Sequence, residues 1–212
     1  MLRTVPLLLA AAAASHLAAG DAPRPDFIVV LLDDVSEDAL RLYGGAAAMP
    51  NLERMAAEGL HVRTAWACPL CGPTRMALFT GLYAPRTGAF TNSNPTVPLD
   101  GPRSRSFPRV LAKNGYRTGW FGKTHFMEDP AATGFRTSLT CRSWPGYDGP
   151  QQDADANEHS MYAVSWYWHP GLVHDGKGVP TTAEDFGPEL EADALVKFIG
   201  SGAEPYLAMW TT

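Results

Sequence analysis

Blocks of apolar and polar positions along the chain predict an α/β fold. Residues 27–32 (FIVVLL) form a continuous apolar run rich in β-branched side chains, which is typical of a parallel strand covered by helices on both faces. Residues 205–210 resemble a second buried strand, and residues 115–125 a third. A shorter stretch with strand character covers residues 62–66. We therefore expect a central sheet that is buried between helices.

Helical spacing alternates with these strands, and most of the predicted helices have recognisable ends. Asn51 is expected to cap the first helix and Gly59 to end it. A short helix covers residues 107–114, and a longer one covers residues 189–199 and ends at Gly200. The inner face of this longer helix is expected to consist of Leu190, Ala194, Leu195 and Phe198.

Composition restricts the function classes. The 212 residues carry 17 basic and 22 acidic side chains, and a net charge of -5 without a basic stripe argues against nucleic-acid binding. Residues 1–20 have the pattern of a secretory signal peptide, with Arg3 before an apolar core and small residues at 18–20. The alternative is a retained anchor, but neither this run nor any later one is long enough to span a bilayer. We expect residues 21–212 to be exported to the periplasm, the secretory pathway, the lysosome or the exterior.

The segment from Cys71 to Gly81 carries the strongest chemical signal. Pro73 suits the first turn of a helix, and Gly81 can close that helix in the left-handed conformation. Cys71 is thereby placed at a helix N-terminus, where free N–H groups and the helix dipole favour an anion. Arg75, one turn later, can direct its guanidinium to the same place. The pattern indicates a nucleophile held beside an anion site.

The three cysteines leave several pairings open. Cys68 and Cys71 form a C-x-x-C pattern that could be a disulfide or half of a metal site, although no second pair stands at zinc-finger spacing. A bridge between Cys68 and Cys141 is compatible with an exported protein. The sequence alone does not show which of these disulfides or metal-binding arrangements is formed.

Asp33 and Asp34 follow the first predicted strand directly. Open α/β sheets build their sites at the carboxyl ends of parallel strands, and two adjacent carboxylates repel unless a cation joins them. Oxygen ligands of this kind suit Ca²⁺ or Mg²⁺. The alternative is an ordinary helix cap or a solvated turn. The pair is therefore a candidate metal site.

Two long stretches have weaker patterns. Residues 83–105 are rich in Pro, Gly, Asn, Arg and Ser and are predicted to form a loop over the site. Residues 127–178 are irregular and aromatic, and the cluster at 166–169 could stack on a sugar or aryl ring or belong to the core. The loop residues that could contact a substrate, unless they are simply solvated, are Arg86, Asn92 and Asn94.

The order Cys71-x-Pro73-x-Arg75, closed by Thr80-Gly81, resembles the signature of the formylglycine-dependent sulfatases. Thr74 replaces the usual serine and keeps its hydroxyl. A second stretch, residues 115–125, resembles the family pattern Gly-Tyr-x-Thr followed by Gly-Lys-x-His, with Phe121 where a smaller residue is commoner. On a strand, Lys123 and His125 would point to the same side. The family resemblance covers nearly all of the chain after residue 20.

This resemblance implies an alkaline-phosphatase-like fold, with a mixed, mostly parallel central sheet flanked by helices on both faces. Residues 21–212 would correspond to the N-terminal portion of a catalytic domain, incomplete at the C-terminus. Cys71 would be converted to formylglycine by a formylglycine-generating enzyme, and one hydroxyl of its hydrate would attack sulfur. The residues implied in catalysis are Cys71, Arg75, Lys123 and His125, and those implied in Ca²⁺ binding are Asp33, Asp34 and Cys71.

Other functions remain open beside sulfate ester hydrolysis. A phosphatase or phosphonate monoester hydrolase of the same superfamily would use the same aspartates. A chain with only half of the site could bind ions without turnover, because Ca²⁺ normally takes six to eight ligands. A thiol redox protein built on Cys68 and Cys71 would leave Arg75 and the aspartates unexplained. The substrate could be an aryl, choline or carbohydrate sulfate.

Overall fold

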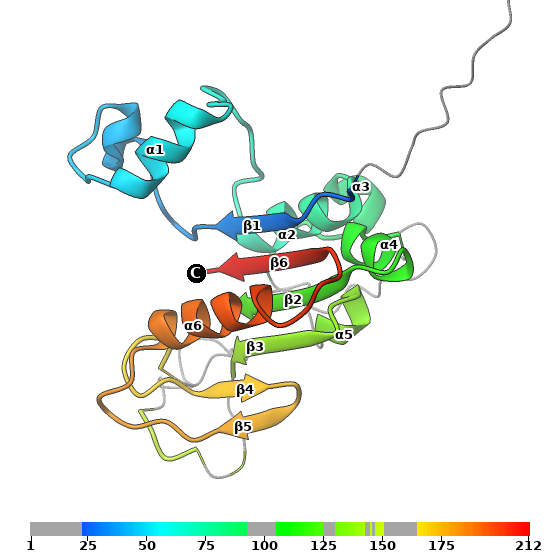
Figure 1. Cartoon of the computed structure of the whole chain (residues 1–212). Coiled ribbons are helices and arrows are strands. Elements are labelled where there is room, and N and C mark those ends of the chain that lie inside the picture. Colours follow the sequence, from blue (N-terminus) through cyan, green and yellow to red (C-terminus); the bar gives the residue numbers. More distant parts are fainter. Residues whose placement is uncertain (1–22, 93–104, 125–129, 143–144, 146, 151–164) are drawn as a thin grey trace, which may run out of the picture.

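The computed structural model describes residues 23–92, 105–124, 130–142, 145, 147–150 and 165–212. These residues form a six-stranded sheet with the spatial order β1-β6-β2-β3-β4-β5 (Figure 1). The predicted signal peptide at 1–20, Asn94 and His125 lie outside the described residues.

Four parallel strands form the main part of the sheet. β1 (Phe27–Leu31) pairs with β6 (Tyr206–Thr211), β6 with β2 (Arg117–Gly122), and β2 with β3 (Thr137–Cys141). Parallel neighbours need crossover connections, and these segments supply them with helices on both sides of the sheet. The expected mixed, mostly parallel sheet is confirmed, because only the pairings of β4 with β3 and with β5 are antiparallel in the described sheet.

The antiparallel part is a short hairpin of β4 (Leu172–His174) and β5 (Lys177–Val179). Its turn consists of Asp175 and Gly176, with φ angles of 48° and 80°. A turn with two positive φ angles favours Asp-Gly and matches the twist of the flanking strands. The prediction that residues 127–178 are irregular was therefore wrong for β3, β4 and β5.

Helices cover both faces of the sheet (Figure 1). α2 (Cys71–Thr80) and α4 (Phe107–Lys113) lie on one face, and α6 (Gly187–Ile199) lies on the other. The shorter elements are α1 (Pro50–Glu58), α3 (Ala84–Thr87), α5 (Pro130–Thr133) and the 3-10 turns η1 (Glu37–Ala39) and η2 (Arg41–Tyr43).

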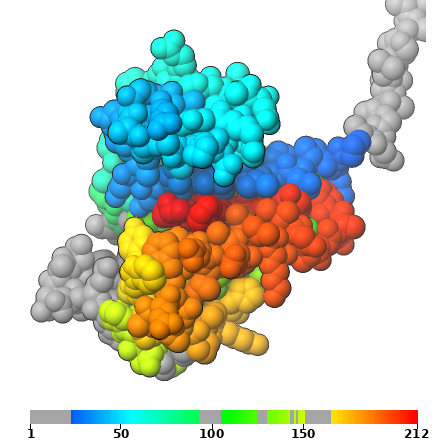
Figure 2. Space-filling model, turned by 60° about the vertical axis from the view of Figure 1, so that its left-hand side comes forward, coloured from blue at the N-terminus to red at the C-terminus, as the bar shows by residue number. Residues whose placement is uncertain are grey.

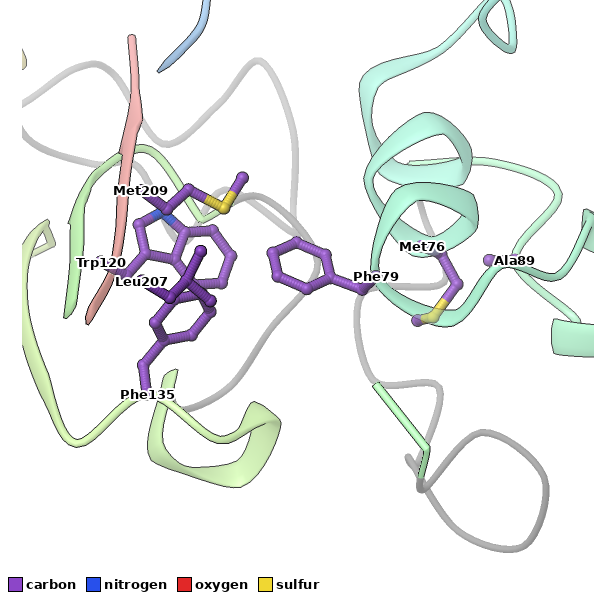
Figure 3. Close-up of a cluster of buried hydrophobic side chains, with 7 residues drawn as sticks. All are labelled: Met76, Phe79, Ala89, Trp120, Phe135, Leu207 and Met209. Carbon is purple, nitrogen blue, oxygen red and sulfur yellow. The ribbon is translucent and has the colours of Figure 1, made fainter. Parts of the chain in front are cut away.

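The first hydrophobic cluster fills the α2 face of the sheet. Phe79 lies between the layers, with its ring 5.2 Å from that of Trp120 and 5.4 Å from that of Phe107 (Figure 3). Offset aromatic contacts of this kind stabilise a core beyond the area that they bury. The cluster fixes α2 against the sheet and therefore fixes where its N-terminus lies. Its buried members are Met76, Phe79, Ala89, Trp120, Phe135, Leu207 and Met209.

The second cluster fills the α6 face. Leu195 is buried against Phe121 and Ala208, whose strands belong to the centre of the sheet. The predicted inner face of α6 is confirmed, and the helix ends before Gly200 as expected. The predicted helical members that pack on this cluster are Leu190, Ala194, Leu195 and Phe198.

The N-terminal part of the chain differs from these expectations. β1 is an edge strand in the described sheet, and Ile28 and Val30 are 53% and 51% exposed rather than covered on both faces. Figure 2 shows this strand, in blue, at the molecular surface below the cyan residues that include α1. α1 begins after Met49 with Pro50 at its first position, so Asn51 is not the cap, while Gly59 ends the helix as predicted. Residues 62–66 form no strand.

Candidate active site

The carboxyl ends of β1, β6 and β2 meet at one edge of the sheet, and the site residues follow them. The Asp33 N–H lies 3.4 Å from the Thr212 hydroxyl oxygen, to which it donates. The Lys123 N–H donates to the Thr211 carbonyl at 2.8 Å, so the chain after β2 stays beside β6. This edge is where open α/β sheets place their ligands.

Lys123 lies one residue beyond the end of β2. Gly122 has a φ of 96°, and a Cβ there would approach the Thr211 carbonyl oxygen to 2.0 Å, so only glycine fits this turn. The turn ends the strand, and the expectation that Lys123 lies on a strand was wrong. The Lys123 ammonium lies 4.9 Å from the centre of the Trp166 ring, a cation–π contact.

α2 places Cys71 at its first position, as predicted. Leu70 is the extended residue before the helix, and its carbonyl accepts the Thr74 N–H at 3.1 Å. The Thr74 hydroxyl donates to the Cys68 carbonyl at 2.9 Å, which ties the preceding turn to the helix. Gly81 closes the helix at φ 68°, in the predicted left-handed conformation.

Asn92 lies directly against the start of α2. Its side-chain oxygen accepts the Gly72 N–H at 3.0 Å and lies 3.7 Å from the Cys71 sulfur. One N–H of the predicted anion site is therefore already bonded. A Cβ at Gly72 would meet the same oxygen at 3.0 Å, so the small residue after Cys71 permits this approach. Asn92 is therefore not simply a solvated loop residue, and its contact with a substrate stays a prediction.

Arg75 joins three segments from a buried position, with 1% of its surface exposed. Its Nη1 donates to the Lys123 carbonyl at 2.6 Å, and its Nη2 lies 3.4 Å from Oδ1 of Asp33. The Lys123 ammonium contacts the other oxygen of the same carboxylate. Asp33 therefore lies between two cations, and the guanidinium is directed at Asp33 and Lys123.

The residues predicted to bind a metal do not form one group of ligands in the structure. Asp34 is exposed and has a φ of 51°, which turns the chain away after Asp33. Within the residues that can be described, no three His, Cys, Asp or Glu side chains form a group that could hold a metal ion. The oxygen donors suit Ca²⁺, but two carboxylates are fewer than its usual ligand number, and both oxygens of Asp33 already face cations. These residues alone do not make a complete calcium site.

None of the three cysteines forms a disulfide, and all three lie in the described residues. Cys68 precedes α2 on one face of the sheet, whereas Cys141 ends β3 and packs in the cluster on the other face. Of the states that the sequence left open, the structure has three free cysteines, with neither a Cys68–Cys71 nor a Cys68–Cys141 disulfide. Burial, followed by the nearby charge of Glu191, raises the pKa of the Cys141 thiol far above its usual range.

Glu191 is a buried acid near the site that the sequence did not reveal. It lies on α6 with 6% of its surface exposed, and burial raises its pKa to about 7, while the hydrogen bond from Trp210 opposes this shift. The Trp210 N–H donates to Oε2 of Glu191 at 3.2 Å. A cavity of about 40 Å³, enough for a water molecule, is lined by Glu191, Lys123 and Cys141.

Comparison with known proteins identifies the relatives of the chain. The family model described as Sulfatase matches residues 25–178. N-acetylglucosamine-6-O-sulfatase of Bacteroides thetaiotaomicron is 28% identical over 178 residues, which are 83% of this chain and 27% of that protein. Steryl-sulfatase of Mus musculus is 36% identical over 147 residues, which are 59% of this chain and 23% of that protein. The chain thus spans about a quarter of the length of these two relatives.

Solved structures share the fold. A structure in complex with its substrate D-glucosamine-2-N,6-O-disulfate has a TM-score of 0.71 at 24% identity, over 89% of this chain and 34% of that one. A sulfatase from Pseudoalteromonas sp. has a TM-score of 0.65 at 24% identity, over 88% and 43% of the two chains. At these identities the likeness establishes the α/β architecture described above. In the described part of the chain, no helix has the length and apolar character needed to cross a membrane.

Proposed function

Because the chain belongs to the sulfatase family, we propose that it takes part in the hydrolysis of sulfate monoesters, with residue 71 as the nucleophile after conversion of the cysteine to formylglycine. The observation that supports this most directly is the position of Cys71 at the start of α2, one turn before an arginine that contacts both Asp33 and Lys123. The relatives are roughly three times as long as the chain, so the activity of the whole protein is part of the proposal.

The residues of the chain would supply a fixed, positive environment. The sulfuryl oxygens are negatively charged, and further charge grows on the leaving alcohol oxygen as the ester bond breaks; preorganised cations stabilise such charge without reorganising. The ammonium of Lys123 would face a substrate oxygen beside Asp33, whereas Arg75 is buried and holds the Asp33 carboxylate in place. Asn92 would orient the side chain at position 71. His125 is proposed to assist proton transfer at the nucleophile.

The nucleophile and the metal are further parts of the proposal. One hydroxyl of hydrated formylglycine would attack sulfur while the bond from sulfur to the alcohol oxygen breaks and the alcohol leaves. Loss of a proton from the other hydroxyl would then expel sulfate and restore the aldehyde. Asp33 and Asp34 would contribute oxygen ligands to Ca²⁺, with Mg²⁺ as the alternative, and position 71 would lie beside them. Since the described residues do not complete that site, the remaining ligands must come from elsewhere.

We infer the substrate only as a class. The relatives are named for amino sugar and steryl sulfates, which supports a sulfate monoester of a carbohydrate or an aryl or alkyl alcohol. The pattern of residues 1–20 supports export, which would bring the chain to extracellular, periplasmic or lysosomal substrates.

Mass spectrometry of the tryptic peptide that spans residues 64–75 tests the nucleophile. After co-expression with a formylglycine-generating enzyme, we expect an aldehyde or its hydrate at residue 71, while Cys68 in the same peptide still reacts with iodoacetamide. The Cys68→Ser variant is the control, because it removes the second thiol and should leave the conversion unchanged. Two alkylated thiols, or a disulfide between them, would contradict the proposal.

A paired ester assay tests the reaction class. The converted chain and its Cys71→Ala variant are compared on 4-nitrophenyl sulfate and 4-nitrophenyl phosphate, with and without Ca²⁺. We expect any turnover to be of the sulfate ester and to depend on residue 71. Preference for the phosphate ester would favour a phosphatase or phosphonate monoester hydrolase. Full conversion at residue 71 without any turnover would favour a chain that only binds ions or sulfate.

A further inference from the structure

A second, larger cavity of about 620 Å³ lies between α6 and the sheet. We call it the α6 cavity, and its apolar wall consists of side chains from α6, β2, β3 and β4. Cavities between about 300 and 1,000 Å³ with mostly apolar walls are typical of small-molecule sites. The apolar residues of the wall include Phe121, Leu139, Leu172, Leu190 and Ala194.

The α6 cavity opens at the end of the sheet opposite to Asp33 and Lys123. Arg117 begins β2 and Thr137 begins β3, and both line the cavity. The Arg117 guanidinium donates to the Phe198 carbonyl at 2.8 Å, which places the last turn of α6 at this same end. β2 rises about 17 Å over its six residues, so the cavity mouth is separated from the candidate active site by the length of a strand.

The charged residues of the α6 cavity all carry positive charge. Arg117, Arg136 and Lys197 line it, His174 adds a titratable ring, and none of the described lining residues is acidic. Arg117 is partly neutralised, because its Nε lies 3.7 Å from Glu204. Lys197 is exposed, and so is Arg136, whose Nη2 donates to the Ala112 carbonyl of α4 at 3.3 Å. An apolar wall with cations at one end complements a ligand whose charge and apolar body are separated.

We propose that the α6 cavity binds an anionic amphiphile, a small molecule with an alkyl or aryl body and one carboxylate, sulfonate or sulfate group. The body lies against Val179, Leu190 and Ala194, which line the cavity and are partly exposed, and the head group meets Lys197 at the mouth. The site is independent of the function proposed above, because it uses none of the residues around Cys71 and faces the other end of the sheet.

Fluorescence titration of the 212-residue chain with 8-anilinonaphthalene-1-sulfonate tests the proposal. We expect saturable binding at one site, with displacement by decanoate. Decanol has a similar body without the charge and should displace the probe about tenfold less well, since the charged contact is absent. Equal displacement by the two competitors, or no saturable binding, would overturn the proposal.

Matched variants locate the probe. Ala194→Trp fills the cavity and should weaken binding at least about tenfold, whereas Val196→Trp adds the same side chain to the exposed side of α6 and should leave binding unchanged. Ala194→Leu is the smaller filling change if the first variant does not fold. Lys197→Glu should weaken binding, and Lys113→Glu, at an exposed position of α4, is its charge control. Equal binding by both members of either pair would show that the probe lies elsewhere.

Discussion

α1 and α6 are both helices whose apolar spacing is visible in the sequence, yet they relate to the sheet in opposite ways. α6 buries Leu195 and Glu191 and packs four predicted positions against the second cluster. α1 has no buried residue, and Met55 on its apolar side is 65% exposed. An apolar stripe therefore predicts that a helix forms, whereas its contribution to stability depends on whether a partner surface lies opposite it.

The same contrast extends to the elements around each helix. The central strands β2 and β6 bury nearly all of their side chains between α2, α4 and α6. β1 and the segment before α2 instead expose large apolar groups, including Trp66 at 93% and Leu60 at 89%. The stability of the described chain is thus concentrated in the sheet and its two clusters. Three changes measure how far the α6 region and the α1 region differ.

The largest expected effect is the loss of a buried leucine in α6. Leu195→Ala leaves a cavity in the second cluster and should lower the free energy of unfolding by about 2 to 5 kcal/mol. Met55→Ala is the matched change in α1 and should alter it by less than about 0.5 kcal/mol, because that side chain is exposed. Urea denaturation measures both. Similar losses in the two variants would mean that α1 is packed as firmly as α6.

A smaller effect, which depends on pH, concerns the buried acid of α6. The folded chain binds the Glu191 proton more tightly than an unfolded chain does, because its pKa is about 7 against an ordinary 4.5. The resulting loss of stability begins as the pH rises above 4.5 and is complete above 7. The Glu191→Gln variant lacks this ionisable group. Its free energy of unfolding should exceed that of the parent by up to about 3 kcal/mol at pH 8 and should equal it near pH 4.

Urea denaturation at pH 4, 6 and 8 measures this difference. Glu189→Gln, in the exposed first turn of the same helix, is the control and should show no comparable gain with pH. A constant difference between Glu191→Gln and the parent at all three pH values would show that burial does not shift the pKa of Glu191.

The smallest expected effect is confined to α1. The Glu53 carboxylate accepts the Met49 N–H at 3.1 Å, a contact that stabilises the start of the helix. Glu53→Ala should lower the global free energy of unfolding by less than about 0.5 kcal/mol. Amide exchange within residues 50–58 should nevertheless become faster, since local opening costs less there. Hydrogen exchange detected by mass spectrometry distinguishes local opening of α1 from global unfolding. Slower or unchanged exchange in α1 would contradict the prediction.

Much of the fold could be predicted where local signals were strong. The apolar runs of β1 and β6, the proline and glycine that bound α2, and the spacing of α6 each specify an element without reference to the rest of the chain. β4 and β5 were missed because three residues give too short a pattern, although Asp175-Gly176 is a recognised hairpin signal. The exposure of β1 was not predicted, because an apolar run indicates a strand but does not indicate which other elements pack against that strand.

In the candidate site, too, residues in local motifs could be predicted, whereas contacts that depend on the folded structure could not. Cys71, Arg75, Asp33 and Lys123 were predicted from motifs, and the structure joins Arg75, Asp33 and Lys123 through one carboxylate. Asn92 approaches from 21 residues beyond Cys71, a contact that no local pattern encodes. Glu191 was hidden within an amphipathic helix, because its burial depends on where α6 meets β6. The roles of these residues and of His125 remain predictions.

The position of β6 between β1 and β2 has a consequence for biosynthesis. β1 ends at residue 31, but the strand that pairs with it begins only at residue 206. At about 5 to 20 residues per second, a ribosome needs roughly 9 to 35 s to translate the interval. Throughout that time β1 and β2 have no strand between them, so Asp33 and Lys123 cannot yet meet. The segment that carries Cys71 is therefore translated well before the strand that closes the sheet between β1 and β2.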